Sequence, residues 1–242
     1  MRDGLQSGGA GRTGTRGVIL CDFDGTITTV DVTDTLCRQS IPERWAELER
    51  QWLSGEISAT ECYEREYEAL GLGQEQIDAF LETVALSPGT QRLIRLADEL
   101  GWEFHVLSAG FDYYIERILH QRGLPVPYTA NSLSFTPEGK PVLRFLDGTD
   151  PQCRRFRPPC AGCKPATWRE WKQRGYRIAF VGDGTTDFCM ADAFKLAREP
   201  GDLLFAKKRL LQYCHLNDIP AIPYETLDDV AERLARSRHR RP

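Results

Sequence analysis

The 242-residue sequence contains no stretch approaching the roughly 18 uncharged apolar residues of a membrane-spanning helix, which excludes an integral membrane protein. It also lacks the apolar segment of a secretory signal, since residues 1–17 are rich in Gly, Arg and Thr. Eight cysteines are spread over the chain, and only Cys160 and Cys163 stand close together. We therefore expect a cytoplasmic protein with mostly reduced thiols.

The negative net charge is concentrated away from the two ends of the chain. Net charge is −4, but residues 1–17 contain three Arg and residues 236–242 contain four, so the remainder is more acidic than the total. Residues 30–86 alone contain four Arg against 13 Asp and Glu, which indicates a solvated acidic face. This distribution opposes nucleic-acid binding over a general surface, and we expect neither a nucleic acid nor a membrane as partner.

Apolar periodicity predicts an α/β fold. Short apolar runs at 18–21, 103–107 and 178–181 are typical of buried strands, and strands alternate with helical patterns from residue 87 onward. This alternation predicts a parallel, doubly wound sheet with helices on both faces. Two short runs at 132–135 and 142–145, separated by Pro-Glu-Gly, predict a hairpin.

Residues 30–86 show helical spacing and no strand pattern, so we expect a helical insertion after the first strand. The predicted parts are a disordered leader (1–16), a core (17–29 and 87–235), the insertion (30–86) and a basic tail (236–242). The junctions at 28–30 and 86–89 are the candidate hinges of the insertion. At Gly89 a bulky residue is then expected to slow turnover more than it harms folding.

Polar residues follow three of the apolar runs. The first is followed by Asp22-Phe23-Asp24-Gly25-Thr26, the second by Ser108-Ala109-Gly110, and the third by Gly182-Asp183-Gly184-Thr185-Thr186-Asp187. Lys164 opens a predicted helix before the third run. Because ligands of parallel sheets bind beyond the carboxyl ends of the strands, these groups are expected to meet in one site.

The chemistry of that site follows from its residue types. Four carboxylates at one sheet edge repel one another unless a cation neutralises them, and hard oxygen ligands favour Mg²⁺. One carboxylate can attack phosphorus to form an aspartyl-phosphate, while a second exchanges protons with the leaving alcohol and with water. The Ser108 hydroxyl, the Lys164 ammonium and backbone N–H groups would hold the phosphoryl oxygens.

The three polar segments and Lys164 form four motifs. In their order along the chain they resemble the motifs of the haloacid dehalogenase (HAD) superfamily of phosphatases, over about residues 18–206. The resemblance implies a HAD-like Rossmannoid core with an inserted all-helical (C1-type) cap, formed by residues 30–86 as in the phosphoserine-phosphatase-like branch. The resemblance also implies that Asp22 is the nucleophile and Asp24 the general acid and base. Mg²⁺ would be held by Asp22, the Asp24 carbonyl and Asp183, with Asp187 in support. The phosphate would be bound by Ser108, Ala109 and Lys164.

Within that branch, segments 24–28, 109–113, 160–164 and 204–224 are similar to those of the methionine-salvage phosphatases. These act on 2-hydroxy-3-keto-5-methylthiopentenyl-1-phosphate, and their subfamily is also described by a 2,3-diketo-5-methylthio-1-phosphopentane substrate. The segment 182–189 also resembles the phosphoethanolamine/phosphocholine phosphatases. We expect a Mg²⁺-dependent phosphatase, monomeric or homodimeric, that acts on a small phosphorylated metabolite.

Several alternatives stay open at this point. The substrate could also be phosphoserine, phosphoethanolamine or phosphocholine. From other functional classes, a receiver-like phospho-Asp signalling domain also uses an Asp, Mg²⁺ and a Lys, and an inactive binding module could retain the fold. A receiver normally has its acceptor after a middle strand, whereas here the first strand precedes Asp22, which favours the enzyme.

Three further groups have both a structural and a functional interpretation. Asp31 and Asp34 are more typical of surface or capping residues than of substrate contacts. The basic cluster Arg154, Arg155 and Arg157 either attracts a phosphorylated substrate or belongs to a solvated loop. The cysteines at 153, 160 and 163 have metal-like spacing, but they lack a fourth ligand and a nearby His, so loop thiols are favoured.

Overall fold

The computed structural model describes residues 16–146 and 155–238, and the fold is given for these residues. Residues 1–15 of the predicted leader and the end of the basic tail lie outside the described residues, as do Cys153 and Arg154. No described helix is both long enough and apolar enough to span a membrane.

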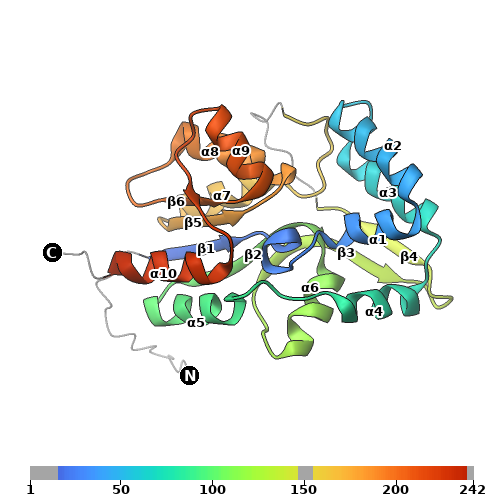
Figure 1. Cartoon of the computed structure of the whole chain (residues 1–242), viewed down its shortest axis with the longest axis horizontal. Coiled ribbons are helices and arrows are strands. Elements are labelled where there is room, and N and C mark those ends of the chain that lie inside the picture. Colours follow the sequence, from blue (N-terminus) through green and yellow to red (C-terminus); the bar gives the residue numbers. More distant parts are fainter. Residues whose placement is uncertain (1–15, 147–154, 239–242) are drawn as a thin grey trace, which may run out of the picture.

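One sheet runs through the centre of the molecule, with its strands in the order β4-β3-β2-β1-β5-β6-β7 (Figure 1). The strands are β1 (Gly17–Cys21), β2 (Glu103–Phe111), β3 (Tyr128–Phe135), β4 (Pro141–Arg144), β5 (Arg177–Gly182), β6 (Leu203–Ala206) and β7 (Ile222–Pro223). Neighbouring strands are parallel except for β3 and β4, which are antiparallel. The predicted α/β class and mostly parallel sheet are therefore confirmed.

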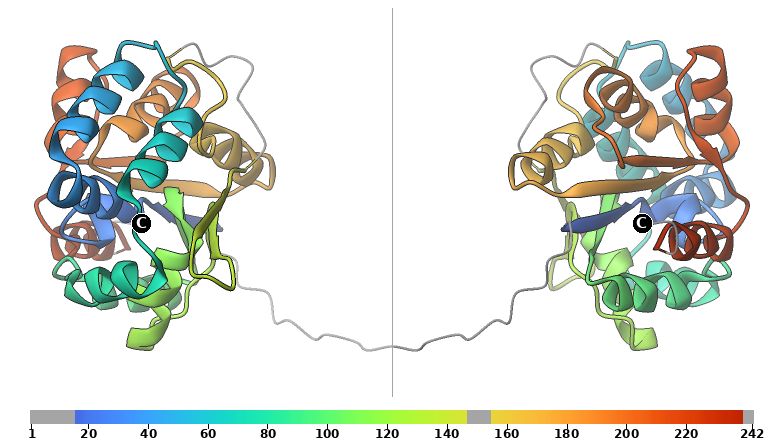
Figure 2. Two further views of the ribbon diagram at one scale, coloured as in Figure 1. Left: turned by 90° about the vertical axis from the view of Figure 1, so that its right-hand side faces the viewer. Right: turned by 90° about the vertical axis from the view of Figure 1, so that its left-hand side faces the viewer.

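Helices cover both faces of this sheet (Figures 1 and 2). One face carries α5 (Thr90–Leu100), α6 (Asp112–Ile118) and α10 (Leu227–Arg238), and the other carries α7 (Lys164–Gln173), α8 (Phe188–Ala197) and α9 (Lys208–Leu216). The central strand β1 shows why both faces need to be covered, because successive side chains of a strand point to opposite faces of the sheet. Ile19 and Cys21 pack with the first set of helices, and Val18 and Leu20 pack with the second.

Four helices occupy the chain between β1 and α5: α1 (Val32–Ser40), α2 (Pro42–Leu53), α3 (Ala59–Leu70) and α4 (Gln74–Thr83). Within this described stretch there is no strand, as the periodicity predicts. Local signals define the helix starts: the Asp31 carboxylate accepts a hydrogen bond from the Asp34 N–H, and Ser58 and Glu61 form a reciprocal capping box. We call residues 32–83 the helical insertion.

The two connections between sheet and insertion run side by side. Thr28 and Leu86 form an antiparallel bridge. The Thr29 N–H donates to the Ala85 carbonyl at 3.0 Å, and the Ser87 N–H donates to the Ile27 carbonyl at 2.7 Å. The junctions that the sequence marks as hinges are thus joined into a short two-stranded ribbon.

The predicted hairpin is present as β3 and β4, with Ser132 opposite Arg144. Two boundaries differ from expectation. β3 begins at Tyr128, because its first half pairs in parallel with β2. β2 itself continues to Phe111 through a register shift after Leu107, so Ser108 lies in an irregular part of the strand and not beyond its end.

Gly89 has a packing role that the hinge hypothesis did not foresee. Its φ of +87° is in the left-handed region, and a Cβ there would lie 2.1 Å from the backbone nitrogen of Asp228. The Leu227 N–H also donates to the Pro88 carbonyl, so this turn is fixed against the start of α10. The structure therefore predicts that a bulky residue at this position harms folding, in contrast to the expectation that it mainly slows turnover.

We predict that Gly89→Ala lowers the free energy of unfolding by about 3 kcal/mol, because the new Cβ meets both backbone strain and a backbone clash. Gly55→Ala is the matched control: its φ is +78°, but nothing lies within 4 Å of the added carbon. It should cost only about 1 kcal/mol. Urea denaturation of the two variants makes the comparison, and equal losses would contradict the packing role.

Candidate active site

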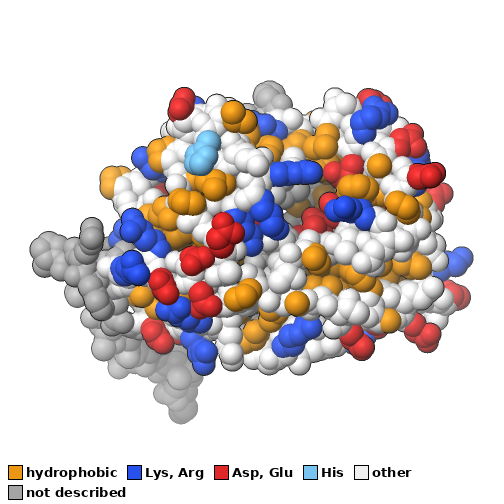
Figure 3. All heavy atoms as spheres, viewed as in Figure 1, with side chains coloured by type: hydrophobic (Ala, Val, Ile, Leu, Met, Phe, Trp, Pro, Cys, Tyr) orange, Lys and Arg blue, Asp and Glu red, His pale blue; other side chains and the backbone are white. Residues whose placement is uncertain are grey.

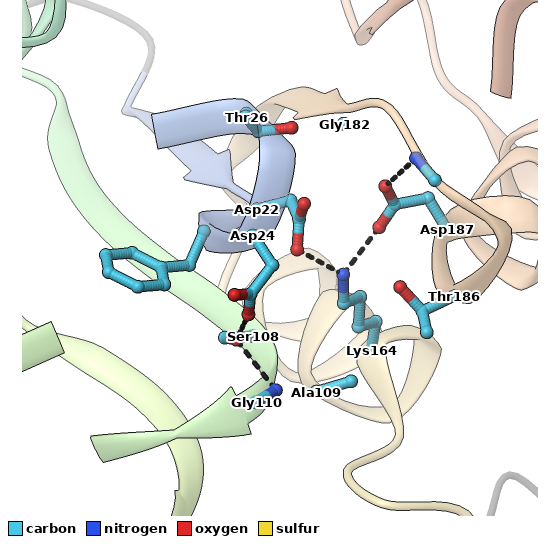
Figure 4. A network of polar contacts seen from close by, with 12 residues as sticks. Asp22, Asp24, Thr26, Ser108, Ala109, Gly110, Lys164, Gly182, Thr186 and Asp187 are labelled. Atoms are coloured by element: carbon cyan, nitrogen blue, oxygen red, sulfur yellow. Dashed lines mark hydrogen bonds and ion pairs between the residues drawn. The ribbon is translucent and has the colours of Figure 1, made fainter. Parts of the chain in front are cut away.

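The predicted site residues converge at the carboxyl edge of the central strands (Figure 4). Asp22 follows β1, Asp183 follows β5, and Ser108 lies in β2. Lys164 is the first residue of α7, which brings its side chain to the same edge. Three parallel neighbours in the sheet thus supply one cluster of polar groups, as the strand-end rule predicts.

Lys164 is the buried cation of this cluster. Its ammonium donates to Asp22 Oδ1 at 2.6 Å and to Asp187 Oδ1 at 2.5 Å, and its side chain is 2% exposed. Burial by itself lowers the pKa of Lys164, but the charges of Asp187 and Asp22 outweigh burial and raise it. Lys164 is therefore a permanent positive charge beside Asp22.

Asp187 organises the loop that follows β5. Its Oδ2 accepts hydrogen bonds from the backbone N–H groups of Asp183, at 2.9 Å, and Gly184, at 3.1 Å. Its other oxygen accepts from Lys164. Both oxygens of Asp187 are thus engaged in holding the loop and the lysine.

Asp24 connects the sheet edge to the helical insertion. Its Oδ1 accepts from the Val32 N–H at the start of α1, at 3.0 Å, and its Oδ2 accepts from the Ser108 hydroxyl at 3.2 Å. The Ser108 oxygen in turn accepts from the Gly110 N–H at 2.8 Å. Burial raises the pKa of Asp24 to about 6, despite the opposing hydrogen bond from Val32. A carboxyl with this pKa can both donate and accept a proton near neutral pH.

Asp183 makes two contacts that sequence reasoning missed. Its Oδ1 accepts from the Thr26 hydroxyl at 3.3 Å, and its Oδ2 accepts from the Lys208 ammonium at 2.8 Å. Lys208 also donates to the Gly25 carbonyl at 3.3 Å. The sequence does contain a signal for the contact with Lys208. Lys207 and Lys208 follow the apolar run of β6, another parallel strand whose carboxyl end lies at the same edge of the sheet.

The donor set of the site fits a divalent cation. One carboxylate oxygen from each of Asp22, Asp183 and Asp187 lies within 4.8 Å of the others. Burial raises the pKa of Asp22 well above its usual range, and the charges of Asp187, Asp183 and Asp24 raise it further. Burial and Asp187 likewise raise the pKa of Asp183. Hard oxygen ligands that repel one another are suited to Mg²⁺.

A cavity of about 240 Å³ opens beside these residues. On the face shown in Figure 3, acidic and basic side chains gather around a hollow between the insertion and the α8–α9 side of the molecule. Its inner wall includes Asp22, Asp24, Ala109 and Asp183, and its outer wall comes from the insertion, with Asp31, Asp34, Glu49, Cys62, Tyr63 and Glu66. The solvated face predicted from the sequence therefore explains only some of the acidic residues in this part of the chain, since several others line the cavity.

Asp31 and Asp34 have structural partners and also line the cavity. Asp31 caps α1, and Asp34 accepts a hydrogen bond from the Trp45 indole at 2.9 Å. The capping role predicted for Asp31 is confirmed, and contact of either acid with substrate stays a prediction.

The basic and cysteine-containing segment before α7 also reaches the cavity. Arg155 forms an ion pair with Asp192 at 2.9 Å, and Arg157 donates to the Glu56 carbonyl in the insertion at 2.5 Å. Cys160 and Cys163 line the cavity. The two described arginines are exposed in a loop but have partners in other parts of the protein, and attraction of a phosphorylated substrate by them stays a prediction.

Solved structures show the same fold. A substrate-bound phosphoserine phosphatase superposes with a TM-score of 0.60 at 20% identity, covering 87% of this chain and 93% of that one. A phosphoserine phosphatase from T. onnurineus gives a TM-score of 0.59 at 19% identity and covers 93% and 97%. At these identities the likeness concerns the fold.

Sequence relatives extend over nearly the whole chain. A protein of an Exiguobacterium species named 2-hydroxy-3-keto-5-methylthiopentenyl-1-phosphate phosphatase is 28% identical over 215 residues, which are 88% of this chain and 94% of that protein. A protein of the same name from Geobacillus kaustophilus is 28% identical over 222 residues, covering 90% and 96%.

The family model of the haloacid dehalogenase-like hydrolases matches residues 19–192. This range includes all four motifs, from Asp22 to Asp187, and extends from β1 through the helical insertion to β5 and α8. The chain therefore belongs to the haloacid dehalogenase-like hydrolases.

Proposed function

We propose that the protein is a Mg²⁺-dependent phosphatase that hydrolyses a small phosphomonoester through an aspartyl-phosphate on Asp22. The observation that carries this proposal is the contact of the buried Lys164 ammonium with the Asp22 carboxylate, 2.6 Å apart, where Asp22 itself lines the cavity. A carboxylate nucleophile has to approach an anionic phosphate, and a fixed positive charge beside it reduces their repulsion.

The proposed reaction has two halves. An oxygen of Asp22 attacks phosphorus, the bond between phosphorus and the ester oxygen breaks, and Asp24 gives its proton to the departing alkoxide. Asp24 then takes a proton from water, the resulting hydroxide attacks the same phosphorus, and the Asp22 carboxylate leaves. The pKa of Asp24 near 6 suits a group that acts as acid in one half and base in the other.

The remaining residues bind and orient. Ser108 is hydrogen-bonded to Asp24 next to Ala109 and Gly110, which line the cavity, and in this proposal the Ser108 hydroxyl and the Ala109 backbone donate to phosphoryl oxygens (Figure 4). Asp22, Asp183 and the Asp24 carbonyl would hold Mg²⁺, with Asp187 in support. When bound, the ion supplies positive charge that offsets the repulsion between carboxylates and phosphate. We also propose that residues 30–86 act as a cap that limits water at the cavity.

The names of the relatives supply one candidate substrate. They make 2-hydroxy-3-keto-5-methylthiopentenyl-1-phosphate, an intermediate of methionine salvage, the first ester to test. Phosphoserine, phosphoethanolamine and phosphocholine are the alternatives, and the charge of the cavity, discussed below, favours an ester with an amino group. The hydrolase family supports an enzyme over a receiver-like domain or an inactive binding module.

We predict that Asp22→Asn lowers kcat on a generic phosphomonoester by at least about 10⁴-fold, because an amide cannot form the phosphoenzyme. Asp98→Asn, on the exposed face of α5, is the matched control and should retain wild-type turnover. Acid-quenched reactions with labelled ester should show phosphate bound to the wild-type protein alone. Wild-type turnover by Asp22→Asn would refute the nucleophile assignment.

Removal of divalent ions should abolish activity reversibly. After dialysis against EDTA we expect less than a few per cent of turnover, and added Mg²⁺ should restore it, because the acids of the site repel phosphate without a counter-ion. Thermal unfolding followed in parallel should show a Mg²⁺-dependent rise in the melting temperature. Undiminished activity in EDTA would remove the metal from the proposal.

A further inference from the structure

A second acidic cluster lies across the cavity from the catalytic carboxylates. Glu49 of α2 and Cys62 and Glu66 of α3 each offer a ligand atom within 4.8 Å of the others, and all three line the cavity. Helical spacing brings Cys62 and Glu66 to one face of α3, because residues four apart are neighbours on a helix. None of these residues belongs to the four motifs.

Glu66 is a buried acid without a compensating cation. It is 3% exposed, and among the described residues no ion pair involves it or Glu49. Burial, followed by the charges of Glu49 and Asp34, raises the pKa of Glu66 to about 8, and the Cys62 thiol is its hydrogen-bonding neighbour. Burying a carboxyl in this way is costly, so a structural role alone accounts poorly for it.

Glu49 shares this environment closer to the mouth of the cavity. Burial and the charge of Asp34 raise its pKa to about 7, and the exposed Arg209 opposes this effect. Aromatic side chains complete the wall: Tyr63 and Trp52 line the cavity, and Trp52 stacks on Phe156 with ring centroids 5.4 Å apart. Acidic groups combined with aromatic faces are the surroundings that bind organic cations.

We propose that the ester's leaving group carries a positively charged nitrogen, which Glu66 and Glu49 bind while the phosphate lies between Asp22 and Ser108. This inference rests on the proposed phosphatase reaction and defines its substrate class as aminoalkyl phosphates. A zwitterionic ester matches the cavity at both ends, because Lys208 lines it beside Asp183 at the phosphate end and the second acidic cluster lines it at the other.

An uncharged leaving group would fit this cavity less well. A methylthio chain offers no cation to Glu66, whose carboxyl would then stay mostly protonated at neutral pH and contribute no charge to binding. The carboxylate of phosphoserine would add a further negative charge beside Glu49 and Glu66. A simple amino alcohol as leaving group provides a cation for Glu66 and adds no negative charge. The test therefore compares esters that contain a primary or a quaternary nitrogen with their neutral isosteres.

The test measures kcat/KM of the full Mg²⁺-loaded chain on two isosteric pairs. Aminoethyl phosphate is compared with propyl phosphate, and choline phosphate with 3,3-dimethylbutyl phosphate. We expect a preference of at least about 10-fold for a cationic ester over its isostere, the usual gain when a site pairs a buried polar group. The pair with the larger ratio shows whether the nitrogen is primary or quaternary.

Glu66→Gln should bring that ratio toward one, because an amide of the same shape carries no charge. Glu68→Gln, on the exposed face of the same helix, is the matched control and should keep the wild-type ratio. A Glu66→Gln variant that slows both esters of a pair equally assigns the residue to structure and overturns the proposal. The same holds if the loss coincides with release of a metal ion held by Glu49, Cys62 and Glu66.

The wild-type comparison separates this inference from the proposed reaction. Turnover of the neutral esters at least as fast as the cationic ones, or a clear preference for the methylthio-pentenyl ester, overturns the cationic leaving group and leaves the phosphatase intact. No turnover of any phosphomonoester with Mg²⁺ would refute the phosphatase itself. The wild-type ratios do not depend on whether a variant folds.

Discussion

The ion pairs of Lys164 with Asp22 and Asp187 are the interaction on which the site depends. An ammonium buried to 2% exposure is tolerable only because two carboxylates face it, and the two carboxylates are tolerable beside Asp183 only because the ammonium is there. This mutual requirement fixes three parts of the chain relative to one another: the end of β1, the start of α7 and the loop after β5. The sheet brings these parts to one edge, and the charges determine their final positions.

Much of this arrangement follows from the sequence, because parallel strands end at one edge and the polar residues after Cys21 and Val181 are easily recognised. Sequence patterns do not predict the structure where tertiary contacts override a local preference. Ser108 lies within a strand because pairing with β3 extends β2. Gly89 is fixed by the approach of α10, a contact between residues more than 130 positions apart that local sequence does not show.

The acids of the insertion illustrate the same limit more clearly. The excess of acidic residues at 30–86 predicts a solvated face, and this prediction is right for Glu64 and Glu68 of α3, since both are exposed. Glu66, between them, lies on the buried side with Tyr67 and Leu70. Helical periodicity tells which side of a helix a residue is on, but only the packed structure shows that this side faces a cavity as well as a core.

The paired connections at residues 27–29 and 85–87 constrain how the insertion can move. Two independent tethers would let a helical unit both twist and swing, whereas two segments hydrogen-bonded to each other must shift together. Rotation about the long axis of the ribbon would break its hydrogen bonds, but bending perpendicular to its plane would not. Any movement of the insertion relative to the sheet would therefore be a bend at this ribbon, and it would also have to break the ion pair between Asp78 of α4 and Arg117 of α6. The Val32 N–H, which donates to Asp24, is only a few residues from the ribbon and would shift little in such a bend.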